Sequence, residues 1–565
     1  MLLPLIDRLR SLSDSSRRWL AAALVAGLIA FSIFCGYVGI DFGFHWDEGL
    51  QVAGVRNCVD KLMLMPSIYN YGSIYVLVGV AVLMAHHLGF FPAFLREMRG
   101  LHDNAISDVE GYQSVKEFQK SARALLDSPR YMLENRMVFF CLCSLTTLWV
   151  YLILRRLYPH RYLGALAAAA FVACSWEFQY HSRFIAVDAL LAQIVAAELL
   201  LLVYCWLART PRAFLGWYLA AAVGAGVAFT CKAPGLVALL AVVCVPFIRP
   251  LEHSLSRRIG LAALAVIVTT AVAIILQPSF VVDPLRNLTV LARIAEEYAK
   301  TASDHPNTTA GIIDRAGSFL AWLWLEVPSP YLWISLVFSP IALFGMGCFM
   351  RDHRRLAILG GVIAVSLVVM MVRHPLMIVR NYLMLLPMLA IGFGLGLRTL
   401  HDRLGQRFQA RWILLLVIAG LFVLNARWLH AAAVGIRDTS AEAIRQAVAV
   451  DLLRRPESVR LSPRAFVELV PRLSSRYRCQ PGGAGGAGGP SHPEAAVLLH
   501  IEEHKWRANV FGLSRRLYGP QAVNYDWYTT WNSRPDRSPI VIISARLARK
   551  QSLPVEPYGV CNPIR

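Results

Sequence analysis

The chain has 565 residues, of which 56% are hydrophobic and only 16% are charged. A soluble domain of this length is rarely so apolar, so the composition excludes an ordinary soluble protein and predicts a polytopic membrane protein. The net charge of +20 does not indicate nucleic-acid binding, because the Lys and Arg residues cluster between apolar runs instead of forming one basic stripe. The eleven Cys show no metal-ligand spacing, although Cys479 and Cys561 could pair in an oxidising compartment.

Apolar runs that approach the length of a membrane span, about 20 residues, follow a basic N-terminus. No cleavage site follows the first run, so we interpret it as a retained anchor. Eleven runs lie near residues 19–40, 135–157, 163–181, 185–207, 214–231, 234–249, 258–280, 330–350, 356–373, 376–397 and 411–429. A twelfth run, 71–90, either crosses the membrane or stays at its surface.

The basic residues between the runs decide this question, because they are retained on the cytoplasmic side. Four arginines before and at the start of the first run place the N-terminus in the cytoplasm. If 71–90 does not cross, the later arginine-rich loops are cytoplasmic as well, whereas a crossing would move all of them outside. We therefore interpret 71–90 as a re-entrant or interfacial helix. This gives about eleven transmembrane helices in the inner (plasma) membrane, external loops 41–134 and 281–329, and an extracytoplasmic C-terminus.

The topology divides the chain into a transmembrane domain, 1–429, and a C-terminal extracytoplasmic domain, 430–565. The second part is polar and contains the flexible stretch "GGAGGAGG" and the strand-like runs "AAVLLHI" and "PIVIIS", which predict a small α/β domain. The external loop 281–329 predicts an amphipathic helix from Pro284 to Lys300. We expect this loop to cover a cavity mouth, with Trp322 and Trp324 at the lipid interface.

Three polar clusters fall on the same predicted outer face. Asp47 and Glu48 follow the first run in "FGFHWDEGLQ", Arg183 and Asp188 lie in "YHSRFIAVDALL", and Lys232 lies in "FTCKAPG". Charges at a membrane edge cost several kcal/mol unless they are paired or solvated. Cations suit a phosphate and a carboxylate can accept a proton from a nucleophile, so the clusters together indicate a site for an anionic, membrane-borne substrate.

The order of these motifs, with "NYGSIY" after the first, resembles the GT-C superfamily of membrane glycosyltransferases. The resemblance covers about residues 19–280 and is strongest to bacterial proteins similar to protein O-mannosyltransferases and lipid A aminoarabinose transferases. It implies a GT-C fold and a sugar donor carried on a polyprenyl phosphate, with inversion of the anomeric centre. It implies no metal, although paired carboxylates could hold a divalent ion.

The resemblance also implies roles for individual residues. Asp47 would be the general base or a carboxylate that orients the acceptor, and Glu48 would hydrogen-bond nearby or hold a backbone turn; we count both as catalytic. Arg183 and Lys232 would bind the donor phosphate, and Asp188 would orient Arg183. Further candidates are His45, Tyr69, Tyr71 and Arg380.

Structural interpretations stay open for the same residues. The carboxylates could solvate the end of a span, Arg183 and Asp188 could form a structural pair, and Lys232 could reach the interface from a helix end. "HIEEH" at 500–504 matches an inverted zinc-protease pattern, but a strand precedes it and the shared helical face is lost.

We therefore predict an inverting glycosyltransferase that moves a sugar from a polyprenyl-phosphate donor to a hydroxyl of a lipid, glycan or protein at the outer face. The alternative is a transporter or flippase of a lipid-linked anion, which would favour polar sites at mid-membrane in two related halves. Which sugar and which acceptor are used is not readable from the sequence.

Overall fold

The computed structural model describes residues 13–38, 40, 46–66, 72–87, 109–159, 161–250, 254–301, 309–373, 379–405 and 408–438, together with five strands between residues 459 and 563. Two compact units divide the chain. The first comprises Met1–Tyr37 and His45–Leu429, and the second comprises Val38–Phe44 and His430–Arg565. Each unit is described by itself below.

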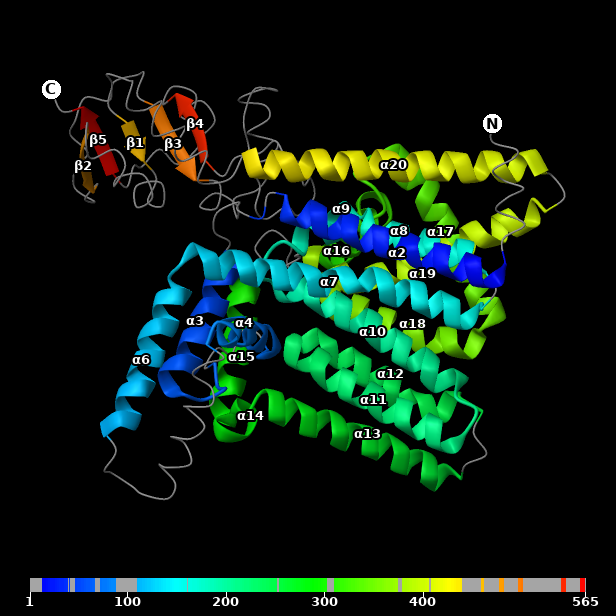
Figure 1. Ribbon diagram of the computed structural model, residues 1–565, viewed down its shortest axis with the longest axis horizontal. Helices are drawn as coiled ribbons and strands as arrows, with labels where there is room; N and C mark the ends of the chain where they lie inside the picture. Colours follow the sequence, from blue (N-terminus) through cyan, green and yellow to red (C-terminus); the bar gives the residue numbers. More distant parts are fainter. Residues whose placement is uncertain are drawn as a thin grey trace. The chain divides into compact units, whose positions relative to one another are not determined.

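Long apolar helices form the first unit (Figure 1). In the described part of the chain, eight helices are long and apolar enough to cross a membrane. At 1.5 Å of rise per residue, a helix of about 20 residues matches the thickness of the hydrocarbon core, about 30 Å. The protein is therefore a multi-pass membrane protein. The eight are α2 (Asp14–Tyr37), α7 (Pro129–Leu157), α10 (Val187–Leu207), α11 (Pro211–Cys231), α13 (Leu255–Leu276), α17 (Leu332–Asp352), α19 (Leu386–Arg403) and α20 (Phe408–Asp438).

The remaining predicted runs form other helices. Run 234–249 becomes α12 (Leu236–Ile248), and run 356–373 becomes α18 (Arg354–Arg373). Run 163–181 is not the single span that the sequence predicts, because it divides into α8 (Tyr162–Ala173) and α9 (Trp176–His181). At the break, Ser175 has extended backbone and donates its hydroxyl to the Val327 carbonyl. Eleven crossings therefore stay a prediction.

In its described residues, the region predicted to be an external loop, 41–134, contains three helices before α7 begins. They are α3 (Trp46–Lys61), α4 (Ile74–Ala85) and α6 (Val109–Leu126). The three pack against one another at one end of α7 (Figure 1). At 12 residues, α4 is about 18 Å long and too short to cross the hydrocarbon alone. This length agrees with the interpretation of run 71–90 as a re-entrant or interfacial helix.

The predicted external loop 281–329 is also largely helical. It contains the end of α14 (Ser279–Val282), α15 (Pro284–Thr301), α16 (Thr309–Ala321) and the π-helix η2 (Trp322–Glu326). The amphipathic helix predicted from Pro284 is confirmed. The expectation for Trp322 is wrong: its side chain is fully buried, with its ring 5.8 Å from that of Tyr382, so it fills the interior and not the lipid interface.

Glycines let two of the long helices approach closely. A Cβ on Gly345 of α17 would lie 1.8 Å from the carbonyl oxygen of Gly392 in α19. A Cβ on Gly396 would likewise lie 1.9 Å from the Ile341 carbonyl oxygen. Without a hydrophobic driving force between spans, close backbone packing through small residues is a main source of helix association in lipid. The α17–α19 contact therefore depends on these positions.

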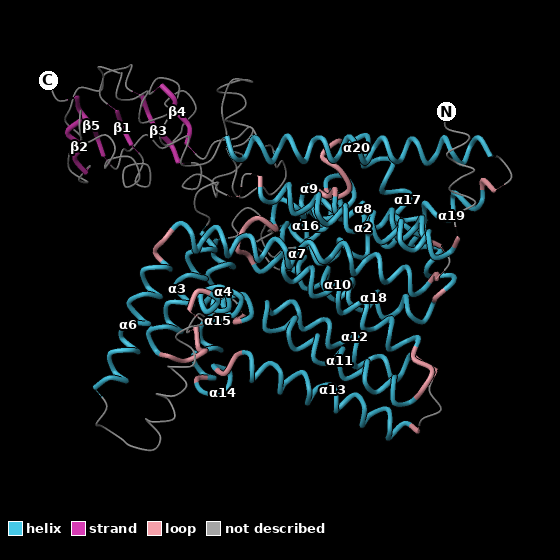
Figure 2. Tube along the Cα trace, viewed as in Figure 1, coloured by secondary structure: helices cyan, strands magenta, loops and turns pink. Residues whose placement is uncertain are grey.

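The second unit contains a five-stranded sheet in the order β2-β5-β1-β3-β4, drawn in magenta in Figure 2. Its strands are β1 (Val459–Leu461), β2 (Tyr477–Pro481), β3 (Ala496–His500), β4 (Ile540–Ser544) and β5 (Gly559–Pro563). Only β1 and β3 pair in parallel. The two predicted strand-like runs correspond to β3 and β4. In the β2–β5 ladder, Cys479 stands directly opposite Cys561.

Candidate active site

A buried turn between α9 and α10 carries Arg183. This side chain is 0% exposed, and its Nη2 donates to the backbone carbonyl of Cys35, near the end of α2, at 2.8 Å. The turn, residues 182–186, is buried throughout, and α10 begins directly after it. The predicted location of Arg183 in a turn is thus confirmed. Its role in phosphate binding stays a prediction.

Glu48, in the first turn of α3, contacts the backbone of the turn that carries Arg183 and holds it in position. Its Oε1 accepts the backbone N–H of Ile185 at 3.3 Å and the Nε of Arg136 at 2.7 Å. Its Oε2 accepts Nη2 of Arg136 at 2.5 Å. The two side chains are 0% and 2% exposed, so this is a two-pronged ion pair removed from water. The expectation that Glu48 holds a backbone turn agrees with these contacts.

Polar side chains next to this ion pair join α3, α4 and α7. The Gln51 amide, one turn after Glu48, donates to the backbone carbonyl of Tyr75 at 2.8 Å and accepts from Asn135 Nδ2 at 2.6 Å. Gln51 and Asn135 are both fully buried. Hydrogen bonds inside a water-poor interior are costly to leave unmade, so this network fixes the start of α3 against its neighbours.

A second ion pair lies between α10 and α11. Lys232 follows the last residue of α11, and its Nζ lies 2.6 Å from Oδ1 of Asp188, the second residue of α10. Asp188 is almost fully buried, whereas the Lys232 side chain keeps 17% exposure. Asp188 therefore contacts Lys232 directly, and its implied role in orienting Arg183 stays a prediction.

The turn after Lys232 depends on glycine. It continues into the 3-10 helix η1 (Ala233–Gly235) and then into α12. A Cβ on Gly235 would lie 2.0 Å from the carbonyl oxygen of Ala228. Only glycine fits this close approach of two backbone segments. The close backbone contact in "KAPG" thereby fixes the backbone position of Lys232 directly after α11.

The structure brings several of the predicted residues to one place. Arg183 and Asp188 lie within six residues, Glu48 contacts Ile185 between them, and Lys232 contacts Asp188. Asp47 belongs to α3, but its side chain lies outside the described residues. His45, Tyr69 and Tyr71 also lie outside the described residues.

Arg380 belongs to the 3-10 helix η3 (Val379–Leu385), which packs against α9 and α10. Its side chain is outside the described part of the chain, so its proposed role is untested. Within the described residues, no three His, Cys, Asp or Glu side chains lie together as metal ligands would.

Sequence reasoning missed Arg136, the partner of Glu48. The signal was an arginine at the start of the apolar run 135–157, because a charge in a span needs a buried partner. It also missed Glu177 and His181, which lie one helical turn apart on α9. Their Oε2 and Nε2 atoms are 3.4 Å apart, and both side chains are about 5% exposed or less. This acid–base pair precedes the Arg183 turn directly.

The arrangement can bind an anion at Lys232. Its ammonium is positioned by Asp188 and keeps access from outside, while Arg183 adds a second fixed positive charge from the buried turn. Charges act over longer distances in a water-poor site than in bulk water. Glu48 is already occupied by Arg136 and Ile185, so it supplies position instead of a free carboxylate.

Comparison with known proteins gives one family. Residues 104–281 match the model of the dolichyl-phosphate-mannose-protein mannosyltransferase family. This range contains Arg136, Arg183, Asp188 and Lys232. Comparison with curated proteins gives no match.

Solved structures similar to this chain include two proteins. One is ArnT from Cupriavidus metallidurans bound to undecaprenyl phosphate, with 16% identity over 93% of this chain and 98% of that chain and a TM-score of 0.47. The other is the Archaeoglobus fulgidus oligosaccharyltransferase in complex with Zn and sulfate, with 13% identity over 79% of this chain and 61% of that chain and a TM-score of 0.43.

Proposed function

We propose that residues 104–281 are a domain of the dolichyl-phosphate-mannose-protein mannosyltransferase family. On this premise, the protein is a membrane glycosyltransferase that moves a sugar from a polyprenyl-phosphate donor to a hydroxyl acceptor at the outer face. The acceptor is a lipid, a glycan or a protein, and transfer inverts the anomeric centre. The observation that carries the proposal is that the family domain contains the Lys232–Asp188 pair and the buried Arg183 turn.

Transfer needs a base, a fixed donor and stabilisation of the leaving group. The acceptor hydroxyl attacks the anomeric carbon and forms the new C–O bond while the bond from that carbon to the phosphate oxygen breaks. The hydroxyl proton passes to Asp47, and the polyprenyl phosphate leaves with the bonding electron pair. The leaving phosphate gains negative charge in the transition state, so fixed cations stabilise that state more than the ground state.

We assign direct contact with the phosphate to Lys232, because it combines a fixed ammonium with remaining exposure. Arg183 contributes its charge from the enclosed turn, and Asp188 orients Lys232. Glu48 is a positioning residue that accepts the Ile185 backbone N–H directly and is itself held by Arg136. The roles of Lys232, Arg183, Asp188 and Glu48 are thus assigned from the burial and the contacts of each side chain.

The test is transfer by the purified full-length protein in liposomes that contain a radiolabelled polyprenyl-phosphate mannose and a panel of lipid, glycan and peptide acceptors. We expect Asp47→Asn to lower the turnover rate by 10²-fold or more, the usual scale for removing a general base, with donor binding nearly unchanged.

The matched control is Asp60→Asn, at the other end of α3. The Asp60 carboxylate accepts from Arg123 Nε at 2.8 Å on the protein surface, so its loss should leave transfer near the wild-type rate. Undiminished transfer by Asp47→Asn would remove the base from the proposal. Absence of transfer from any polyprenyl-phosphate sugar by the wild type would remove the function itself.

A further inference from the structure

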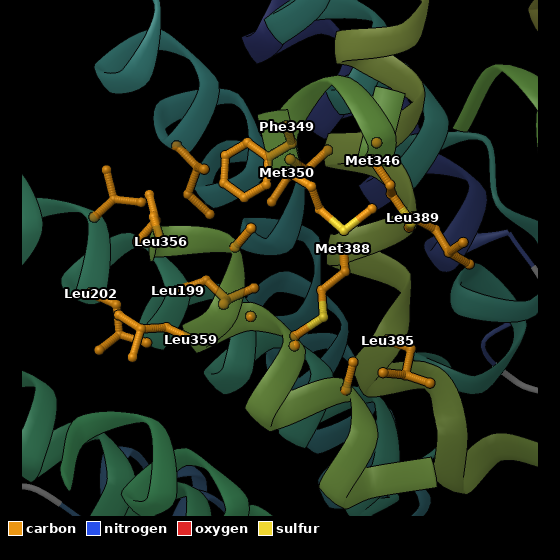
Figure 3. A pocket seen from close by; sticks show the side chains of 18 of the residues that line it. Leu199, Leu202, Met346, Phe349, Met350, Leu356, Leu359, Leu385, Met388 and Leu389 are labelled. Atoms are coloured by element: carbon orange, nitrogen blue, oxygen red, sulfur yellow. The ribbon is translucent and has the colours of Figure 1, made fainter. Parts of the chain in front are cut away.

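An apolar cavity of about 310 Å³ borders α10 at Leu199 and Leu202 (Figure 3), whereas Asp188 is the second residue of that helix. Its walls come from α7, α10, α17, α18, α19, η2 and the last residue of η3, Leu385. Leu202, Met350, Leu359 and Met388 point into it, and the lining is apolar. Flexible Met side chains suit a cavity that accommodates a chain without one fixed shape.

The cavity is elongated along the membrane helices. On α18 the lining residues run from Leu356 to Val368. These twelve steps of 1.5 Å correspond to about 18 Å. One leaflet of the hydrocarbon core is about 15 Å thick, half of about 30 Å. The cavity is therefore long enough for a hydrocarbon chain that extends through one leaflet.

Two adjacent glycines in the wall leave space that the protein does not use. A Cβ on Gly360 or Gly361 of α18 would meet no atom within 4 Å. Gly392 also lines the cavity, but its Cβ would lie 2.8 Å from the Ala342 carbonyl oxygen, so close packing explains that glycine. Glycine inside a helix is unfavourable relative to alanine, and among the described residues no neighbour explains Gly360 and Gly361 by close packing. The space in front of them suits a molecule from outside the chain.

The end of the cavity at Leu356 lies at the arginine-rich end of the helices. Arg354 and Arg355, the first residues of α18, directly precede Leu356, and both are exposed. Arg351 in the last turn of α17 is exposed as well. The candidate active site lies at the opposite end of α10, where Asp188 is the second residue. A ligand with an apolar chain and an anionic group would match this combination of groove and charge.

We propose that the cavity binds one acyl chain of an anionic phospholipid whose headgroup lies on Arg354 and Arg355. This site is separate from that of the sugar donor, because the donor phosphate is assigned to Lys232 at the other end of α10. A polyprenyl tail would enter from the Lys232 end, whereas the exposed arginines favour a phospholipid from the leaflet at their own end.

The first experiment is native mass spectrometry of the full-length protein released from its membrane in mild detergent. We expect the wild type to retain one anionic phospholipid per chain and Gly360→Leu/Gly361→Leu to lose it, because leucine side chains would fill the cavity. The control is Gly347→Leu on α17, which does not line the cavity and whose Cβ also meets nothing within 4 Å. It should retain the lipid. Equal lipid retention by the double variant would overturn the proposal, as would the loss of a polyprenyl phosphate or a zwitterionic lipid, instead of an anionic phospholipid, from that variant.

A second experiment does not depend on the folding of a core variant. Delipidated wild type and Arg354→Gln/Arg355→Gln are titrated with phosphatidylglycerol or phosphatidylcholine while the melting temperature is recorded. The wild type should show a saturable rise with phosphatidylglycerol only. The double variant should bind about thirtyfold more weakly, since each basic residue near an anionic headgroup contributes about fivefold. Equal responses of the two proteins would contradict the assigned headgroup position.

Discussion

The buried ion pair between Glu48 and Arg136 makes a quantitative prediction. In Arg136→Met, the Glu48 carboxylate keeps the Ile185 N–H but loses two charged donors at 2.7 and 2.5 Å. Both partners are almost completely removed from water, so the carboxylate cannot be solvated instead. Removing one partner of such a pair costs about 3–5 kcal/mol. We expect a clearly lower melting temperature and weaker sugar transfer, because the Arg183 turn loses its support.

The same helix offers an exposed control that matches one Nε–Oε1 distance, although the Arg136 pair has a second hydrogen bond from Nη2 to Oε2. Arg130, six residues earlier on α7, contacts Glu134 with the same Nε–Oε1 distance of 2.7 Å. Its side chain, however, is 69% exposed. Exposed pairs contribute about 0–1 kcal/mol, so Arg130→Met should change stability by no more than that. Burial, and not distance, therefore decides the predicted difference between the two variants.

The measurement is thermal unfolding in detergent micelles, followed by transfer in liposomes. The double variant Glu48→Gln/Arg136→Met should be more stable than Arg136→Met alone, because it removes the buried charge that the single variant leaves behind. If Arg136→Met and Arg130→Met melt together, or if the double variant is the least stable of the three, the assignment of a buried, mutually dependent pair is wrong.

Two further predictions concern packing and covalent structure. Gly345→Ala should destabilise the transmembrane unit by about 1–3 kcal/mol, because its Cβ would lie 1.8 Å from a carbonyl oxygen of α19. Gly347→Ala, two residues away with nothing within 4 Å, should leave the melting temperature unchanged or raise it. Cys479 and Cys561 are register partners on β2 and β5, and antiparallel partners have Cα atoms about 4.5–5.5 Å apart, within the range of a disulfide. Neither should react with a maleimide in unfolded, unreduced protein; labelling of both without reductant would contradict the bond.

The long helices could be predicted because their signal is local. The length and hydropathy of an apolar run are properties of consecutive residues, and each of the eight candidate spans falls on a predicted run. The break between α8 and α9 was missed because the sequence prediction treats run 163–181 as one unit. Residues 163–174 are apolar, but residues 175–181, "SWEFQYH", carry four polar side chains, and this change in composition coincides with the break.

Among the polar residues of the site, some features could likewise be predicted from the sequence and others could not. The turn that carries Arg183 was predictable, since it separates two apolar runs. The partner of Asp188 was not, because Lys232 lies 44 residues away and only the packing of α10 on α11 brings them together. Arg136 lies 88 residues from Glu48, which is further than any helical spacing rule extends. Pairings between helices are properties of the fold, so a single sequence shows only that each charge needs some partner.

Adjacent carboxylates at one helix start need not share a chemistry. Both oxygens of Glu48 accept charged hydrogen bonds, and a proton taken up there would disrupt the Arg136 pair, so Glu48 is a poor base. A base at this helix start is therefore better assigned to Asp47. It follows that Glu48→Gln should lose activity together with stability, whereas Asp47→Asn should lose activity at an unchanged melting temperature. If Glu48→Gln keeps the wild-type melting temperature but abolishes transfer, the carboxylate itself takes part in the reaction and the two roles must be exchanged.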